Sequence, residues 1–91
     1  MFGAISPDGK YLAALDTERN VTLYPIEGGE PHRVPNLPAD YVPIRWTPDG
    51  ADLFVIYSSV PGSRIYRVDV ATGKQQLVKE LMPADPMWWM G

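Results

Sequence analysis

Short apolar runs separated by turn-forming residues dominate the pattern of this chain. Two of the runs, 11–15 (YLAAL) and 53–57 (LFVIY), are apolar at nearly every position. A strand with one face in water alternates apolar and polar residues, so unbroken runs predict strands that are covered on both faces. The pattern predicts strands at 2–5, 10–15, 21–26 and 32–35, and again at 42–46, 52–58, 64–70 and 75–80.

A repeated turn divides these strands into two sets. The segment SPDG at 6–9 returns as TPDG at 47–50, and each copy precedes an apolar run and then a Leu-Tyr or Ile-Tyr strand. Proline presets φ at the first corner, aspartate can accept bonds from backbone amides, and glycine takes the positive φ that closes the hairpin. The hairpin-turn residues are therefore expected to be Pro7, Asp8, Gly9, Pro48, Asp49 and Gly50.

The spacing of the repeat indicates the architecture. Four strands in a period of roughly 40 to 45 residues are typical of a β-propeller blade. The sequence thus predicts an all-β chain with two four-stranded antiparallel blades, the first at about 1–37 and the second at about 42–81, within a single unit over 1–91. Residues 82–91 are predicted to form a tail that either resembles an inner strand or seals a junction.

The motifs also carry a resemblance to a known family. ISPDGKYLAAL, followed by VTLYPIEGGEPHRV, resembles the blades of TolB-like, WD-repeat-like β-propellers, and VPIRWTPDGADLFVIYSS with SRIYRVDVATGKQQLVKEL repeats the plan. Together with LMPADP, the second half is similar to propeller segments linked to bacterial serine/threonine protein kinases. The likeness covers about residues 1–86, and it implies blade geometry and frequent use as a scaffold.

Two blades are too few to close a ring, because closed propellers need at least about four. Repeat units also cannot bury their apolar sides alone. Homo-oligomerisation is therefore expected to close the ring, with an even number of blades. A trimer with six blades is favoured, and a tetramer or a pentamer is possible.

Several large side chains are candidates for packing between blades. Trp46 ends an inner strand and is expected to lie against the neighbouring blade, and Tyr24 and Tyr66 are interpreted as one repeated position on the third strands. The full set of blade-packing candidates is Leu12, Tyr24, Trp46, Phe54 and Tyr66. Arg45 has two interpretations: in a rotational assembly it could contribute to an anion site in the channel, or it could form a salt bridge with Asp40 or Glu80.

The two ends of the chain compete for one place in such an assembly. Residues 1–5 and the tail both correspond to the inner strand at 42–46, and only one of them can occupy it at a junction between chains. We expect 1–5 to do so, because they join directly to the first hairpin. Met1, Phe2, Trp88 and Trp89 would then form an apolar seal, and a frayed tail is the alternative.

Composition excludes several classes of function. The net charge is −3 and the Lys and Arg residues are scattered, whereas nucleic-acid binding needs a concentrated basic face. The absence of cysteine excludes a disulfide framework and is compatible with a reducing or an oxidising compartment. No apolar stretch approaches a membrane span of about 20 residues, and the first residues lack a signal peptide's basic start and long apolar core. The sequence thus leaves the compartment open.

Residues with catalytic potential are better explained by structure. His32 is interpreted as a surface side chain, and Ser58, Ser59 and Ser63 fall in a hairpin loop without a nucleophile-elbow pattern. Asp8 and Asp49 are interpreted as turn residues, and the segment from Asp69 to Lys74 as an ordinary hairpin without a phosphate-loop pattern. No enzyme activity, metal or cofactor is expected.

Three interpretations of function remain open. The first is a noncatalytic module that assembles with itself and binds an unidentified protein or small ligand. The second is a fragment of a larger, kinase-linked sensor, which genomic context would reveal. The third is a propeller that gates a hydrolase whose nucleophile lies on another segment.

Overall fold

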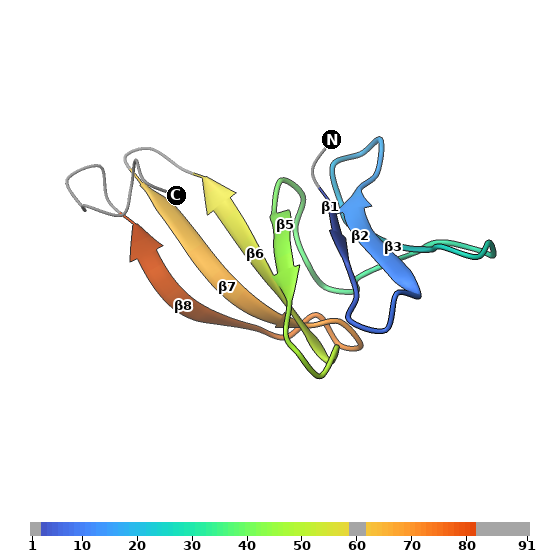
Figure 1. The fold of residues 1–91 in the computed structure, drawn as a ribbon. Coiled ribbons are helices and arrows are strands. Elements are labelled where there is room, and N and C mark those ends of the chain that lie inside the picture. The colour runs from blue at the N-terminus through green and yellow to red at the C-terminus, as the bar shows by residue number, and fades with distance from the viewer. Residues whose placement is uncertain (1–2, 59–61, 82–91) are drawn as a thin grey trace.

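The computed structural model describes residues 3–58 and 62–81, which form eight β-strands and no helix. The strands make two four-stranded antiparallel sheets, each with its strands in sequence order (Figure 1). The first sheet contains β1 (Gly3–Ile5), β2 (Tyr11–Leu15), β3 (Val21–Pro25) and β4 (His32–Arg33). The second contains β5 (Val42–Trp46), β6 (Asp52–Ser58), β7 (Ser63–Asp69) and β8 (Gln75–Leu81).

The predicted strands lie close to those in the structure. The ranges 42–46 and 52–58 match β5 and β6, and other ends differ by one or two residues. The largest difference is at β4, which ends at Arg33 instead of 35. Val34 leaves the strand, donates its amide to the carbonyl of Val21 and turns its side chain into the core. Pro35 follows and has no amide to continue a ladder.

Both Pro-Asp-Gly segments form tight turns between the first two strands of their sheet. The amide of Gly9 bonds to the carbonyl of Ser6, and that of Gly50 bonds to the carbonyl of Thr47, both at 2.9 Å. The two glycines have φ of 74° and 73°. This left-handed conformation is one that glycine adopts without steric cost.

The two sheets pack against each other through one face each, and this contact is here called the internal seam. The innermost strands β1 and β5 lie side by side, and the sheets diverge from them (Figure 1). The first sheet contributes the small Ala4 and Ala13 on β1 and β2 and the larger Val21 and Leu23 on β3, whereas the second sheet contributes bulk on its first two strands as well. The second sheet's strand residues in the hydrophobic core cluster are Trp46, Leu53, Val55 and Val68.

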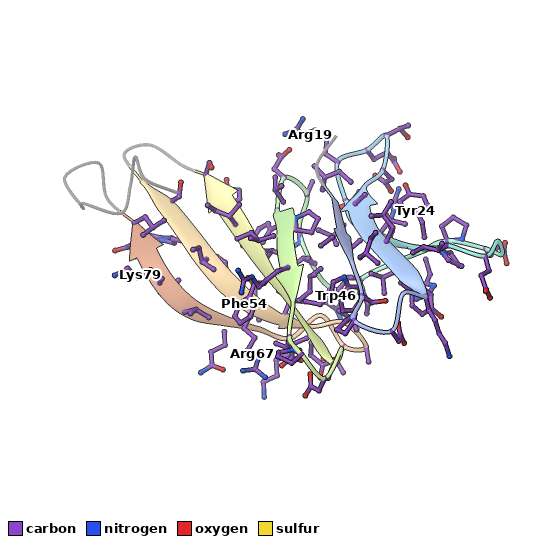
Figure 2. The ribbon with its side chains drawn as sticks, viewed as in Figure 1. Arg19, Tyr24, Trp46, Phe54, Arg67 and Lys79 are labelled. Carbon is purple, nitrogen blue, oxygen red and sulfur yellow. The ribbon has the colours of Figure 1, made fainter. Side chains whose placement is uncertain are left out.

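The internal seam is also held by polar contacts. The indole Nε1 of Trp46 donates to the carbonyl of Ala4 at 2.9 Å, and Figure 2 shows Trp46 between the two sheets. The segment from Val34 to Tyr41 crosses from the first sheet to the second and buries Val34, Leu37 and Tyr41. Within this segment, the Nδ2 of Asn36 donates to the carbonyl of Thr72 at 3.1 Å. The segment therefore fixes how the two sheets are placed.

Within one chain, the strands predicted at 11–15 and 53–57 each have a neighbouring sheet on one face only, so coverage of both faces stays a prediction that depends on assembly. Along β6 the side chains alternate, with Leu53 and Val55 fully buried in the seam and Phe54 and Ile56 only half-buried on the opposite face. One chain supplies only one neighbouring sheet, so the second face has no sheet against it. An unbroken apolar run therefore identifies two apolar faces without showing what covers each.

Candidate functional site

The candidate functional site consists of the two sheet faces that point away from the internal seam. We call them the outer face of the first sheet and the outer face of the second sheet. Cross-strand pairs share a face, so the pairing assigns Ile5, Leu12 and Tyr24 to the first outer face. It assigns Val42, Arg45, Phe54, Ile56 and Ile65 to the second.

Both outer faces are more apolar than a solvent-facing sheet. Ile5 is 63% exposed, and Leu12 and Tyr24 are half-buried. On the second sheet, Phe54 and Ile56 are half-buried. Each lies beside the residue that is paired with it on β7. Contiguous exposed apolar surface of this kind marks interaction sites in soluble proteins. The geometry can therefore support docking of another apolar sheet.

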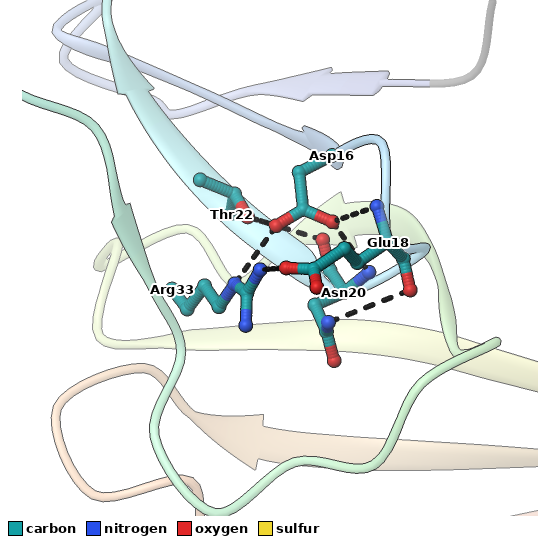
Figure 3. A network of polar contacts seen from close by, with 5 residues as sticks. All are labelled: Asp16, Glu18, Asn20, Thr22 and Arg33. Atoms are coloured by element: carbon teal, nitrogen blue, oxygen red, sulfur yellow. Dashed lines mark hydrogen bonds and ion pairs between the residues drawn. The ribbon is translucent and has the colours of Figure 1, made fainter.

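Polar side chains cover one end of the first outer face (Figure 3). Arg33 on β4 donates from Nε to the Oδ2 of Asp16 at 2.8 Å and also pairs with Glu18. The Oδ1 of Asp16 accepts the amides of Glu18 and Asn20, and the hydrogen bond from Asn20 is the main reason that the pKa of Asp16 is lowered. These polar groups form hydrogen bonds and ion pairs with one another at this end of the face. The apolar part of the face is therefore restricted to β1 and the adjoining halves of β2 and β3.

A small apolar hollow of about 430 Å³ lies where the innermost strands meet. Gly3 of β1, residues 42–44 of β5 and Ile56 of β6 line it. Ile44 is 44% exposed and falls at an irregularity in the pairing of β5 with β6. The hollow extends the apolar outer face of the second sheet toward the inner edge of the molecule.

Arg45 lies beside Phe54 on the outer face of the second sheet, because the two residues are paired across β5 and β6. The proposed salt bridge with Asp40 or Glu80 is wrong, since Asp40 pairs with Arg19 and Glu80 pairs with Arg64. Arg45 is exposed. A role at a channel anion site requires an assembly and stays a prediction.

Tyr24 and Tyr66 do not occupy one repeated position. Tyr24 is opposite Leu12, on the outer face of the first sheet, whereas Tyr66 is opposite Val55, on the seam face of the second. The ring of Tyr66 packs at 5.5 Å from that of Tyr41. The hairpins between the second and third strands differ in length, so the shared residue type does not reflect a shared register.

The second place with converging polar groups is a groove of about 580 Å³ between the two Pro-Asp-Gly turns. Asp8 and Asp49 lie at this groove, and Tyr11, Trp46 and His32 also line it. Each aspartate is bound within its own turn: the Oδ1 of Asp8 accepts the hydroxyl of Ser6 at 2.6 Å, and the Oδ1 of Asp49 accepts that of Thr47 at 2.6 Å. The two carboxylates thus share a groove while each stabilises a turn.

The hydroxyl bonds, followed by backbone amide bonds from Lys10 and Ala51, lower the pKa of Asp8 and Asp49 below their usual value of 3.8. A lowered pKa in the folded state stabilises the fold above the unfolded pKa, and this contribution disappears as the pH falls through the folded value. We expect Thr47→Ala to raise the pKa of Asp49 toward 3.8 and to leave that of Asp8 unchanged. Carboxyl titration by NMR measures both, and a parallel shift of the two would contradict local hydrogen bonding as the cause.

The remaining catalytic candidates that the structure describes lie in separate structural settings. His32 lies on β4 and packs edge-to-face on Tyr11 at 6.0 Å. The hydroxyls of Ser63 and Ser58 contact each other at 3.4 Å across the end of a hairpin, and Ser59 lies outside the described residues. The Oδ1 of Asp69 accepts the amides of Ala71 and Thr72 in the β7–β8 turn. Across residues 3–58 and 62–81, no group of three His, Asp or Glu side chains could hold a metal ion.

The predicted seal of Met1, Phe2, Trp88 and Trp89 lies outside the described residues. Sequence reasoning missed the contact between Gly73 and Pro35, which brings the β7–β8 turn against the crossing segment. It also missed the small residues Ala4 and Ala13, which let the second sheet approach closely. The sequence does contain a signal for this close approach. The first apolar run has alanine at residues 13 and 14, where the second run has larger residues.

No family model matches the sequence, and no curated protein matches it either. In the part of the chain that the structure describes, no helix is long and apolar enough to cross a membrane.

Proposed function

We propose that this chain is a noncatalytic β-propeller module that assembles with copies of itself into a closed ring and serves as a binding scaffold. The observation that carries the proposal is that the two sheets use different faces to contact each other. Leu12 and Leu53 occupy the same position in sequence after the glycine of their Pro-Asp-Gly turns. Even so, Leu53 is buried in the internal seam, whereas Leu12 lies on an outer face.

This packing is head-to-tail. In the internal seam, the first sheet packs through the face that carries Ala13, and the second sheet packs through the face that carries Leu53. One face of each kind remains without a neighbouring sheet. A head-to-tail contact that repeats with a rotation generates a ring when the rotation closes, so a second copy is the natural occupant of the outer faces.

The repeated turns support the scaffold part of the proposal. They bring a groove with carboxylates, aromatic rings and prolines to the rim of the internal seam. Concave sites with a few polar groups at the junction of structural units are common ligand sites. A ring would present one such rim at each junction, in keeping with the resemblance to propeller scaffolds.

The mass of the assembly in solution tests this proposal. Light scattering coupled to size exclusion is expected to give a single species with the mass of three chains, and four or five chains would also be compatible with a ring. A stable monomer at micromolar concentration would overturn the proposal. A broad distribution that grows with concentration would overturn ring closure, because it indicates open polymers.

A further inference from the structure

We infer that the joint between copies places Phe54 and Arg45 of one chain against Ile5 and Leu12 of the next. This inference rests on the proposed function and specifies the residues by which one copy recognises another. It comes from using the internal seam as a template for the joint.

Corresponding positions in the two sheets follow from the turns and the strand pairing. Ile5 is paired with Leu12 just as Trp46 is paired with Leu53, directly on either side of the two Pro-Asp-Gly turns. On the opposite faces, Ala4 is paired with Ala13 in the first sheet, and Arg45 with Phe54 in the second. The pairs Ala4–Ala13 and Arg45–Phe54 are therefore equivalent places.

At the internal seam the bulk comes from the second sheet. Trp46, Leu53 and Val55 lie against the first-sheet pair Ala4 and Ala13. The close approach is marked by the bond from the Trp46 indole to the carbonyl of Ala4.

At the joint between copies the second sheet again contributes the bulk, but from its opposite face. Phe54 takes the place of Ala13, and Arg45 takes that of Ala4. Facing them, Ile5 replaces Trp46, and Leu12 replaces Leu53 without a change of residue type. Ala14, in the place of Val55, is only 2% exposed within its own chain. Interiors are packed to a nearly constant density, so a gain in size on one side must be matched by a loss on the other. On the first two strands of each sheet, the replacements on the two sides go in these opposite directions.

On the third strands both replacements are larger, with Arg67 in the place of Leu23 and Tyr24 in that of Val68. The internal seam has no spare space at these places, because Leu23 and Val68 are buried there, so the size match does not extend to the third strands. Arg67 also turns to an ion pair with Asp52, at 2.5 Å, and Figure 2 shows it on the second sheet. The matched sizes therefore apply to the inner half of the joint.

The joint lacks one stabilising bond of the seam. Ile5 has no donor to replace the Trp46 indole, so the carbonyl of residue 45 receives no equivalent bond. A hydrogen bond of this kind makes a net stabilising contribution. The joint should therefore separate at lower urea concentration than that which unfolds the sheets.

A pair of substitutions can rebuild the internal seam at the joint. In the double variant Ile5→Trp/Arg45→Ala, an indole faces an alanine and can reach its carbonyl, as Trp46 reaches Ala4. We expect the double variant to lower about tenfold the protein concentration at which half of the assembly dissociates. Sedimentation measures this concentration, in an amount of urea that dissociates half of the original assembly. Each single variant is expected to weaken the assembly, Ile5→Trp by overpacking against Arg45 and Arg45→Ala by leaving a space.

Both positions are exposed, so the variants should keep the fold, which circular dichroism checks. Ile26→Trp/Arg64→Ala is the matched control, because it exchanges an exposed isoleucine after β3 of the first sheet and an exposed arginine on β7 of the second, away from the inner half of the joint. Its effects should be additive.

Additive effects of Ile5→Trp and Arg45→Ala in a protein that does assemble would overturn this pairing and leave the proposed function standing. A monomeric original protein would overturn both.

Discussion

Phe54→Asp is expected to leave the chain folded and to convert the assembly into monomers. Phe54 is half-buried on the outer face of the second sheet, where Arg45 and Arg67 are its paired neighbours. In a monomer, a carboxylate at this place keeps contact with water and has two cations beside it. In the joint it would be covered by another sheet, and burial of a charge without a full set of partners costs several kcal/mol. Light scattering and circular dichroism measure the two outcomes.

Val55→Asp is the matched control on the same strand. Val55 is fully buried in the internal seam, so a carboxylate there should unfold the chain itself. Phe54→Leu, which keeps an apolar side chain, should retain assembly. A Phe54→Asp protein that remains assembled would remove this face from the joint, and one that unfolds would make Phe54 part of the monomer's core.

Gly73→Ala is expected to destabilise the fold by about 3 kcal/mol or more, which is in the range of severe single substitutions. A Cβ at Gly73 would lie 1.5 Å from the carbonyl oxygen of Pro35, and the residue has φ of 78°. The crossing segment would have to move away, which would break the bond from Asn36 to Thr72 and loosen the buried side chain of Leu37. Urea unfolding gives the free energy change.

Gly9→Ala separates the clash from the backbone strain. Gly9 has φ of 74°, yet a Cβ there would meet nothing within 4 Å. The left-handed conformation alone costs an L-residue roughly 1–2 kcal/mol. Equal losses for the two variants would show that the contact with Pro35 contributes nothing to stability.

These predictions depend on features that the sequence indicates only in part. From the sequence, Phe54 belongs to a strand covered on both faces, so its replacement by aspartate would be expected to abolish folding and assembly together. The half-burial of Phe54 separates the two effects. Likewise, the sequence marks Gly73 as a hairpin residue, but a turn pattern carries no information about which distant backbone lies against it.

Local chemistry was sufficient for the strands and the turns. Alternation, proline and glycine act within a few residues, so the ranges 42–46 and 52–58 and the two Pro-Asp-Gly turns could be inferred from the sequence by itself. The repeat also predicted two four-stranded antiparallel sheets, which the structure has.

The faces were decided by the tertiary structure. Which side of each strand enters the internal seam depends on pairing across the chain, and a shift of one residue reverses every side chain. The tyrosines show how pairing decides position, because Tyr24 and Tyr66 look equivalent in sequence, yet Tyr24 is opposite Leu12 and Tyr66 is opposite Val55. The match of small residues on the first sheet to bulk on the second is a property of two surfaces in contact, and no local pattern contains it.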